Sequence, residues 1–468
     1  MISLLKSFDE LPLSEPVARA LKELGFTTPT PIQAQALPVL LGGATDFIGL
    51  AATGTGKTAA FGIPLLEKID AQSHHVQAVI LCPTRELALQ VREQLALMGK
   101  HKGVRTLAVY GGTGYQEQFD GLKRGAHVVV GTPGRVIDHI ERKSLSLAHA
   151  KLVVLDEADE MISMGFRDDL EKILRATPRE HGHIWLFSAT MAGDVRRIAD
   201  AYLRKPRHAQ VNRTEMLSAT VQQVYYVVRE HDKPEILCKL IDLADDFYGL
   251  LFCQTKALVM DLNQYLLGKG YKVDCLHGDK SQDERDRAMK AFRDKKTRLL
   301  VCTDVAARGL DVKDLTHVIN YSIPREMELY VHRIGRTARG GKAGLAVSLV
   351  TPTHRHLVNR VEHMTKTKLR EGKIPGRREV AAKKVSRILE SFKTQNDYAK
   401  AVALLGPDWE AAAGDMTLAE VIGRFLTLMA PEVFEEREKE KPFHVPPPHR
   451  DKPKKKFDPS RGGHHKNR

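Results

Sequence analysis

With 468 residues, of which 42% are hydrophobic and 28% are charged, the chain can form about three domains with buried cores, and a mostly disordered protein is excluded. No apolar run approaches the roughly 20 residues of a transmembrane helix, and residues 1–10 lack the apolar centre of a signal peptide, so we expect no membrane attachment. The net charge is +14 and is unevenly distributed along the chain. The five cysteines are scattered and include no Cys-x-x-Cys pair, which predicts a reducing, cytoplasmic compartment and neither a zinc site nor disulfides.

The first 36 residues contain Phe8 and a proline-rich segment, Pro29-Thr30-Pro31, that leads into a helix expected to begin near Ile32. Gln33, in the first turn of that helix, has an amide that both donates and accepts hydrogen bonds, as recognition of a base edge requires. Taken alone, a polar residue in a first helical turn is more simply a surface residue.

Residues 51–58 read Ala-Ala-Thr-Gly-Thr-Gly-Lys-Thr and lie between an apolar run, Phe47–Leu50, and a helix-compatible segment. This context is typical of a phosphate-binding loop, although Ala51 stands where the usual pattern has glycine. Gly54 and Gly56 allow backbone N–H groups to surround an anion. Lys57 can then reach the β- and γ-phosphates, and the hydroxyl of Thr58 can bind Mg²⁺. The alternative is a glycine-rich turn with an incidental Lys-Thr pair.

Short apolar runs rich in β-branched residues alternate with helical segments over residues 37–208 and again over residues 221–372, with a polar linker at 209–220. Such runs are typical of parallel sheets with helices on both faces, so we predict an α/β chain with two parallel-sheet domains. In such sheets ligands bind beyond the carboxyl ends of the strands. The polar clusters at these ends are Pro83–Leu87, Gly111-Gly112, Thr132–Arg135, Asp156–Asp159, Ser188–Thr190, His277–Asp279 with Gln282 and Arg285, Thr303–Asp311, and His332–Arg339.

Residues 373–435 favour helices with regularly spaced apolar residues, which is most economically explained as a small intramolecular bundle. Residues 436–468 form a proline-rich and basic tail, which we expect to be disordered. From Lys441 to Arg468 there are nine Lys and Arg residues against two Asp residues, half of the net charge of the chain. Such a tail either improves solubility or holds a polyanion such as RNA.

Together and in this order, the motifs resemble those of the DEAD-box RNA helicases over roughly residues 6–365. The resemblance includes the literal Asp156-Glu157-Ala158-Asp159, and it implies two tandem RecA-like domains preceded by an adenine-recognition block at 1–36. One departure is Ala338, where many members have glycine, and we expect it to have little effect. The segment 373–435 also resembles the dimerisation module of bacterial cold-shock and ribosome-assembly DEAD-box proteins, so a homodimer is the alternative to the bundle.

The resemblance implies ATP and Mg²⁺ as ligands. Lys57 and Asp156 would hold phosphates and metal, Glu157 would deprotonate the attacking water, and the second domain would supply Arg336 and Arg339 as arginine fingers. Ser188, Thr190 and His332 would couple hydrolysis to strand separation. The residues implied at the nucleotide are Phe8, which would stack on adenine, and Gln33, Ala52, Thr53, Gly54, Thr55, Gly56, Lys57, Thr58 and Asp311, with Thr58 and Asp156 beside the metal.

By the same resemblance, single-stranded RNA or a short duplex would lie across both domains. The contacts would be to phosphates and 2′-hydroxyls and therefore largely independent of sequence. The residues implied are Thr84, Arg85, Gly112, Thr132, Gly134, Arg135, Gln282, Arg285 and Thr303. Two activities stay open, an ATP-dependent RNA helicase and an ATP-gated RNA clamp, while a DNA translocase is disfavoured by the Gln33 segment. Ribosome assembly, RNA decay and cold adaptation are all compatible settings.

Overall fold

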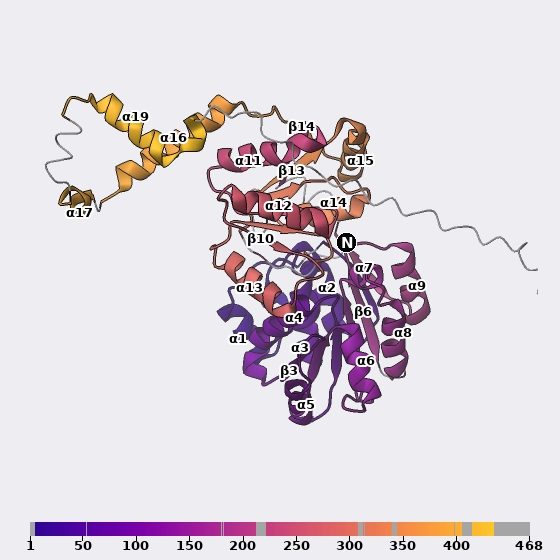
Figure 1. Cartoon of the computed structure of the whole chain (residues 1–468). Coiled ribbons are helices and arrows are strands. Elements are labelled where there is room, and N and C mark those ends of the chain that lie inside the picture. Colours follow the sequence, from indigo (N-terminus) through magenta and orange to yellow (C-terminus); the bar gives the residue numbers. More distant parts are fainter. Residues whose placement is uncertain are drawn as a thin grey trace, which may run out of the picture.

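The computed structural model describes residues 5–52, 54–178, 180, 182–211, 221–307, 312, 314–338, 344–396, 398–404 and 414–434. Figure 1 shows two α/β domains in contact, the first in indigo to magenta and the second in pink to orange. Each contains a seven-stranded sheet whose paired strands are parallel throughout the described residues. The predicted fold class is therefore confirmed.

In the first domain the strand order is β3-β4-β2-β5-β6-β1-β7. The strands are β1 (Phe47–Leu50), β2 (Ala78–Leu81), β3 (Thr106–Val109), β4 (Val128–Gly131), β5 (Leu152–Asp156), β6 (His183–Ser188) and β7 (Arg207–Gln210). The helices are α1 (Glu15–Glu23), α2 (Pro31–Gly42), α3 (Lys57–Lys68), α4 (Arg85–Met98), α5 (Gln116–Lys123), α6 (Pro133–Glu141), α7 (Ala158–Ser163), α8 (Arg167–Ala176) and α9 (Gly193–Tyr202).

Successive residues of the central strands enter two separate cores, one on each face of the first sheet. Val154 packs with the side chains of α2, α3 and α4, whereas its neighbours Val153 and Leu155 pack with those of α6, α8 and α9. Because both faces are covered, β2 and β5 are buried along their whole length, and all their residues are apolar except Asp156 at the end of β5, which explains the continuous apolar runs in the sequence.

In the second domain the strand order is β10-β11-β9-β12-β13-β8-β14. The strands are β8 (Val221–Val227), β9 (Gly249–Phe252), β10 (Val273–Leu276), β11 (Leu299–Cys302), β12 (His317–Asn320), β13 (Gly344–Val350) and β14 (Arg370–Glu371). The helices are α11 (Lys233–Leu243), α12 (Lys256–Gly268), α13 (Gln282–Arg293), α14 (Met327–Ile334) and α15 (His356–Thr365). The five cysteines all lie in described residues, and none of them forms a disulfide.

Three strands, β7, β8 and β14, lie outside the predicted apolar runs. β7 and β14 are short edge strands with mostly exposed side chains, and β8 has two consecutive glutamines, so none of them shows a continuous apolar pattern. β7 ends at Gln210, and the first two residues of the predicted linker therefore belong to the first sheet.

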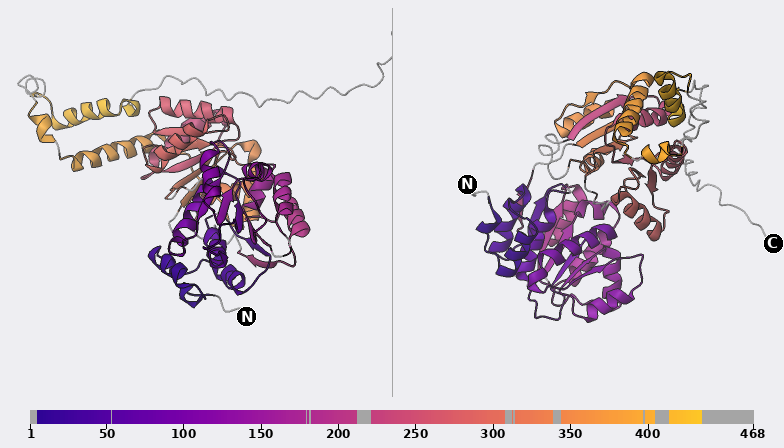
Figure 2. Two further views of the ribbon diagram at one scale, coloured as in Figure 1. Left: turned by 90° about the horizontal axis from the view of Figure 1, so that it is seen from below. Right: turned by 90° about the vertical axis from the view of Figure 1, so that its left-hand side faces the viewer.

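Beyond the second sheet, an arm of helices projects away from both domains (Figures 1 and 2). It contains α16 (Arg377–Thr394), α17 (Tyr398–Val402), α19 (Leu418–Met429) and α20 (Pro431–Phe434). Ion pairs of Lys383 with Asp245 and of Lys384 with Asp242 attach α16 to the end of α11. The predicted basic tail at 436–468 lies outside the described residues. A search of the described helices found none with both the length and the apolar character needed to cross a bilayer.

Candidate nucleotide and RNA site

The loop between β1 and α3 has the backbone geometry of a phosphate-binding loop. Gly54 and Gly56 have φ of 80° and 92°, in the left-handed region that favours glycine. A Cβ at Gly56 would also lie 2.5 Å from Nε2 of Gln33. The Thr55 hydroxyl donates to the carbonyl of Ala52 over 2.7 Å and closes the turn, whereas Thr53 lies outside the described residues.

Lys57 and Asp156 form a buried pair of opposite charge at the end of this loop. Lys57 is 5% exposed, and its Nζ has no hydrogen-bond partner among the described residues. Burial raises the pKa of Asp156 to about 7, although the charge of Lys57 opposes that rise. A buried ammonium without a partner fits a phosphate oxygen, and the carboxylate with the Thr58 hydroxyl offers the hard oxygen donors that Mg²⁺ prefers.

No cluster of three or more His, Cys, Asp or Glu side chains in the described part of the chain is arranged to hold a metal ion. Mg²⁺ in phosphoryl-transfer sites is usually held by one or two protein groups together with the phosphates of the substrate. The residues present therefore fit a metal that arrives with a nucleotide.

Gln33 connects the N-terminal block to the phosphate loop. Its Oε1 accepts a hydrogen bond from the backbone N–H of Thr30 over 2.9 Å, and its Nε2 donates to the carbonyl of Gly56 over 3.0 Å. An amide nitrogen carries two hydrogens, so Nε2 has the chemistry to donate to a base edge as well. Phe8 is only 5% exposed and packs edge-to-face against Phe26, with ring centroids 5.5 Å apart. The stacking of adenine on Phe8 stays a prediction.

Glu157 directly follows β5 and caps the N-terminus of α7. Its φ of 53° and ψ of 51° place a non-glycine residue in the left-handed region, and its side chain is buried. Its backbone N–H donates to Oδ1 of Asp156 over 3.0 Å. Backbone strain of this kind is concentrated at functional sites, and here it occurs at the residue predicted to activate water.

The predicted coupling residues meet around Asp159. The Asp159 carboxylate accepts hydrogen bonds from the backbone N–H and the hydroxyl of Thr190, over 2.8 and 3.0 Å, while the Ser188 hydroxyl accepts from the Asp159 N–H over 3.2 Å. From the second domain, Nδ1 of His332 lies 2.9 Å from Oε1 of Glu160. Burial tends to raise the pKa of Asp159, but the charge of His332 and the other partners hold it below its ordinary value.

Sequence reasoning assigned no coupling role to Asp159 or Glu160. Asp159 is the last residue of the Asp156–Asp159 motif and Glu160 directly follows it. This position was the only available signal, because their partners come from the end of β6, from the residues just after it, and from α14, far away in the chain.

Arg333 is a further residue without a predicted role of its own. Its guanidinium forms two bonds to the Asp304 carboxylate, of 2.6 and 2.8 Å, and Nη1 donates to Asn320 and to the carbonyl of Ser322. These contacts fasten the last turn of α14 to the ends of β11 and β12. Arg336 follows in the next turn and is 7% exposed, whereas Arg339 and Asp311 lie outside the described residues.

Three of the predicted RNA-binding residues, Arg85, Gln282 and Arg285, lie at helix starts where the two domains meet. Arg85 forms an ion pair with Asp286 over 3.1 Å, and Arg285 lies 3.6 Å from Glu86, so the starts of α4 and α13 contact each other across the domains. Gln282 also donates to Glu86. The other predicted residues are partly buried or exposed in segments that follow strands, namely Thr84, Gly112, Thr132, Gly134 and Thr303. Arg135 is the exception, because its side chain is only 9% exposed.

Ala338 has a φ of 57°, in the left-handed region, where the Cβ of any residue other than glycine strains the backbone. A left-handed conformation costs a non-glycine residue roughly 1–2 kcal/mol, partly offset because glycine loses more entropy on folding. We therefore expect Ala338→Gly to stabilise the second domain by about 0.5–1 kcal/mol, contrary to the expectation of little effect.

The measurement is the thermal unfolding midpoint of the full chain, which should rise by about 1–4 °C. An Ala346→Gly substitution inside β13 is the matched control and should lower the midpoint. A lower midpoint for Ala338→Gly would contradict a strained Ala338.

Comparison with known proteins gives a consistent result. Residues 30–198 match the family model of the DEAD/DEAH box helicases, and residues 232–341 match the helicase conserved C-terminal domain. The chain is 42% identical over 412 residues to the DEAD-box ATP-dependent RNA helicase CshA of Bacillus licheniformis, covering 86% of this chain and 84% of that protein. It is 46% identical over 365 residues to CshA of Bacillus cereus, covering 78% and 69%.

Solved structures show the same arrangement of two domains. S. cerevisiae Dbp5 bound to RNA and ADP BeF3 is similar with a TM-score of 0.74 and 32% identity, covering 82% of this chain and 99% of that chain. Mss116p bound to single-stranded RNA and AMP-PNP is similar with a TM-score of 0.69 and 28% identity, covering 86% and 87%.

Proposed function

Since this chain belongs to the DEAD/DEAH-box helicase family and is an ATP-dependent RNA helicase, we propose that it hydrolyses ATP only when RNA holds its two domains together, and that it thereby separates short RNA duplexes. The contact between His332 and Glu160 carries the proposal, because it places α14 of the second domain against α7 of the first, at the residue that directly follows the Asp156–Asp159 motif. The chemistry is thus divided between two domains whose approach RNA can control.

The groups of the first domain can bind and orient the nucleotide. The ammonium of Lys57 and the N–H groups around Gly54 and Gly56 would contact phosphates, and the amide of Gln33 would contact adenine. Mg²⁺, held by Thr58 and Asp156, would neutralise charge on the phosphates. Glu157 would accept a proton from the attacking water, and Arg336 with Arg339 would stabilise charge in the transition state.

RNA contacts from both domains would favour the closed arrangement. The exposed backbone at Gly112 and Gly134 supports contacts to phosphates rather than to base edges. RNA binding would therefore be largely independent of sequence. Cellular substrates in ribosome assembly, RNA decay or cold adaptation are compatible with such sequence-independent binding. Crosslinking followed by sequencing of the bound RNA would distinguish them.

The direct test measures ATP turnover of the purified chain with and without single-stranded RNA, together with separation of a short labelled duplex. We expect RNA to raise turnover strongly and ATP to be required for strand separation. Equal turnover with and without RNA would refute the coupling of the two domains.

A second part of the proposal is a homodimer formed through residues 373–435. The arm exposes large apolar side chains, among them Phe392 at 76%, Leu418 at 75% and Leu428 at 78%. A helix such as α19, whose apolar residues are mostly exposed, gains stability when a partner covers it. The resemblance of this segment to a dimerisation module favours a second copy of the chain as that partner.

Light scattering over a range of protein concentrations tests this prediction. We expect the full chain to have twice the monomer mass and a truncation after residue 372 to be monomeric. Within the full chain, Phe425→Ser with Leu428→Ser should weaken the dimer, whereas Leu267→Ser on α12, another exposed apolar residue, should not. A full chain with the monomer mass at all concentrations would exclude the dimer.

A further inference from the structure

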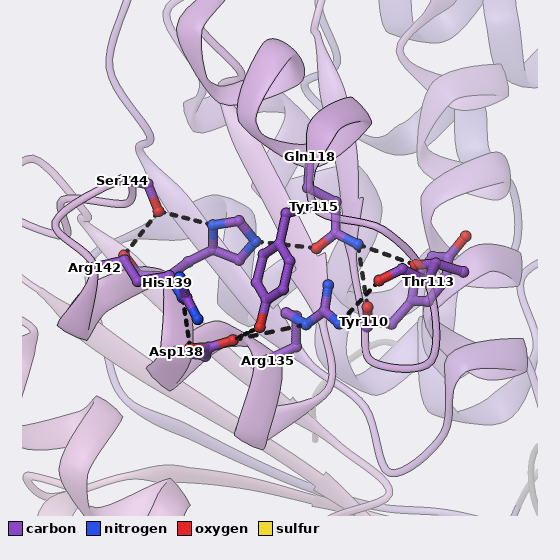
Figure 3. Close-up of polar contacts among 9 residues, drawn as sticks. All are labelled: Tyr110, Thr113, Tyr115, Gln118, Arg135, Asp138, His139, Arg142 and Ser144. Carbon is purple, nitrogen blue, oxygen red and sulfur yellow. Dashed lines mark hydrogen bonds and ion pairs between the residues drawn. The ribbon is translucent and has the colours of Figure 1, made fainter.

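Tyr115, which directly precedes α5, lies against the guanidinium of Arg135 in the first turn of α6. The Cζ atom of Arg135 is 4.0 Å from the centroid of the Tyr115 ring. The Tyr115 hydroxyl donates to the carboxylate of Asp138, and Figure 3 shows the ring beside Arg135 with its hydroxyl directed toward Asp138. A guanidinium is attracted to the face of an aromatic ring and stacks on it. Tyr115 therefore fixes the plane of this guanidinium.

The contacts of the Arg135 guanidinium leave one nitrogen atom without a partner. Nη2 donates to the carbonyl of Thr113 over 3.1 Å, and Nε lies 4.0 Å from Oδ2 of Asp138. Nη1 is buried and has no hydrogen-bond partner among the described residues. A buried, unsatisfied donor on a charged group is costly, and a phosphate oxygen would remove that cost. Gly112 and Gly134, next in sequence to Thr113 and Arg135, are exposed, so an RNA strand can approach from that side.

The charges around Tyr115 also favour an anion. Arg142, at the C-terminal end of α6, donates to Oδ1 of Asp138 over 2.9 Å and lies 4.7 Å from the Tyr115 centroid. The hydrogen bonds from Tyr115 and Arg142 lower the pKa of Asp138, so this carboxylate is ionised at neutral pH. One carboxylate between two guanidinium groups leaves a net positive charge. Asp138 can therefore help to hold Arg135 without cancelling its attraction for phosphate.

We propose that Tyr115 is a positioning residue for RNA binding, whose ring holds the guanidinium of Arg135 so that Nη1 takes a phosphate oxygen of the RNA. An arginine side chain has many rotamers, and much of that freedom is lost when it binds a ligand. Stacking on Tyr115 transfers this loss from the binding step to folding. Tyr115 lies outside the predicted set of RNA ligands and acts through Arg135. The inference rests on the proposed function, because it concerns the same RNA-binding surface.

The test measures binding of a fluorescent single-stranded RNA and RNA-stimulated ATP hydrolysis by variants of the full chain. For Tyr115→Leu we expect the RNA concentration at half-saturation, and that at half-maximal stimulation, to rise about three- to tenfold, the usual effect of ordering one long side chain. Turnover at saturating RNA should stay at the wild-type value. Tyr115→Phe keeps the ring over Arg135 and should recover most of the affinity.

A double-mutant cycle shows whether the ring acts through Arg135. Arg135→Ala should weaken RNA binding and lower the slope of log affinity against log salt by about 0.7, because one phosphate contact is lost. Tyr115→Leu alone should leave that slope nearly unchanged. In the Arg135→Ala background, Tyr115→Leu should cause no further loss of affinity. Losses that simply add, or wild-type affinity in either single variant, would overturn the inference.

Tyr202→Leu is the matched control, since the Tyr202 hydroxyl likewise contacts a carboxylate, on Glu171, and an arginine, Arg175, in the same domain. It should bind RNA like the wild type. Binding of a fluorescent ATP analogue confirms that each variant is folded, and Tyr115→Ile repeats the cycle if Tyr115→Leu does not fold. A wild-type chain that neither binds RNA nor responds to it would refute the proposed function, whereas a responsive wild type with additive losses would refute this inference alone.

Discussion

Replacement of Glu157 by glutamine is expected to reduce RNA-stimulated ATP hydrolysis by about 10²–10⁴-fold while ATP and RNA still bind. Glutamine has the shape of glutamate but cannot accept the proton of the attacking water. Glu157 is buried beside Asp156, whose raised pKa is due first to burial and in part to the charge of Glu157. Removing that charge leaves Asp156 more easily ionised, so binding of ATP with Mg²⁺ should be kept or strengthened.

The measurement is turnover at saturating ATP and RNA, with separate titrations of a fluorescent ATP analogue and of labelled RNA. Glu171→Gln provides a control, because Glu171 forms ion pairs with Arg167 and Arg175 on α8, apart from the nucleotide loop. Turnover within about tenfold of the wild type would show that another group activates the water.

Replacement of Arg336 by alanine should lower RNA-stimulated turnover by about 10³–10⁵-fold, the usual effect of an arginine finger. This corresponds to roughly 4–7 kcal/mol of transition-state stabilisation. Arg336 follows the last turn of α14, where Arg333 donates two hydrogen bonds to Asp304. It belongs to the second domain, whereas the phosphate loop belongs to the first. ATP binding by the first domain should therefore change little. The effect should appear in turnover at saturating ATP and RNA.

Arg336→Lys keeps the charge without the planar fork and should recover only part of the activity. Arg360→Ala, an exposed arginine on α15 of the same domain, is the matched control. If Arg336→Ala keeps turnover within a few-fold of the wild type, the assignment to Arg336 fails. The transition-state charge would then depend on Arg339, the other predicted finger, which lies outside the described residues.

The strands and the phosphate loop could be predicted from the sequence because the signals for them are local. A strand of a parallel sheet covered on both faces is apolar at every position, as in Ala78–Leu81, and Gly54 and Gly56 identify a loop that needs left-handed backbone. The motif order was sufficient to indicate the family. β8 was not predicted, because its Gln222 and Gln223 interrupt the apolar pattern.

The partners of the site residues were decided only by the tertiary structure. Arg85 and Asp286 form an ion pair although they are 201 positions apart, and the contact of His332 with Glu160 also joins two domains. Arg135 is similar to the other predicted RNA ligands in sequence, yet stacking on Tyr115 buries it. Local pattern specifies which backbone a segment adopts, whereas the environment of a charged side chain depends on the segments that fold against it.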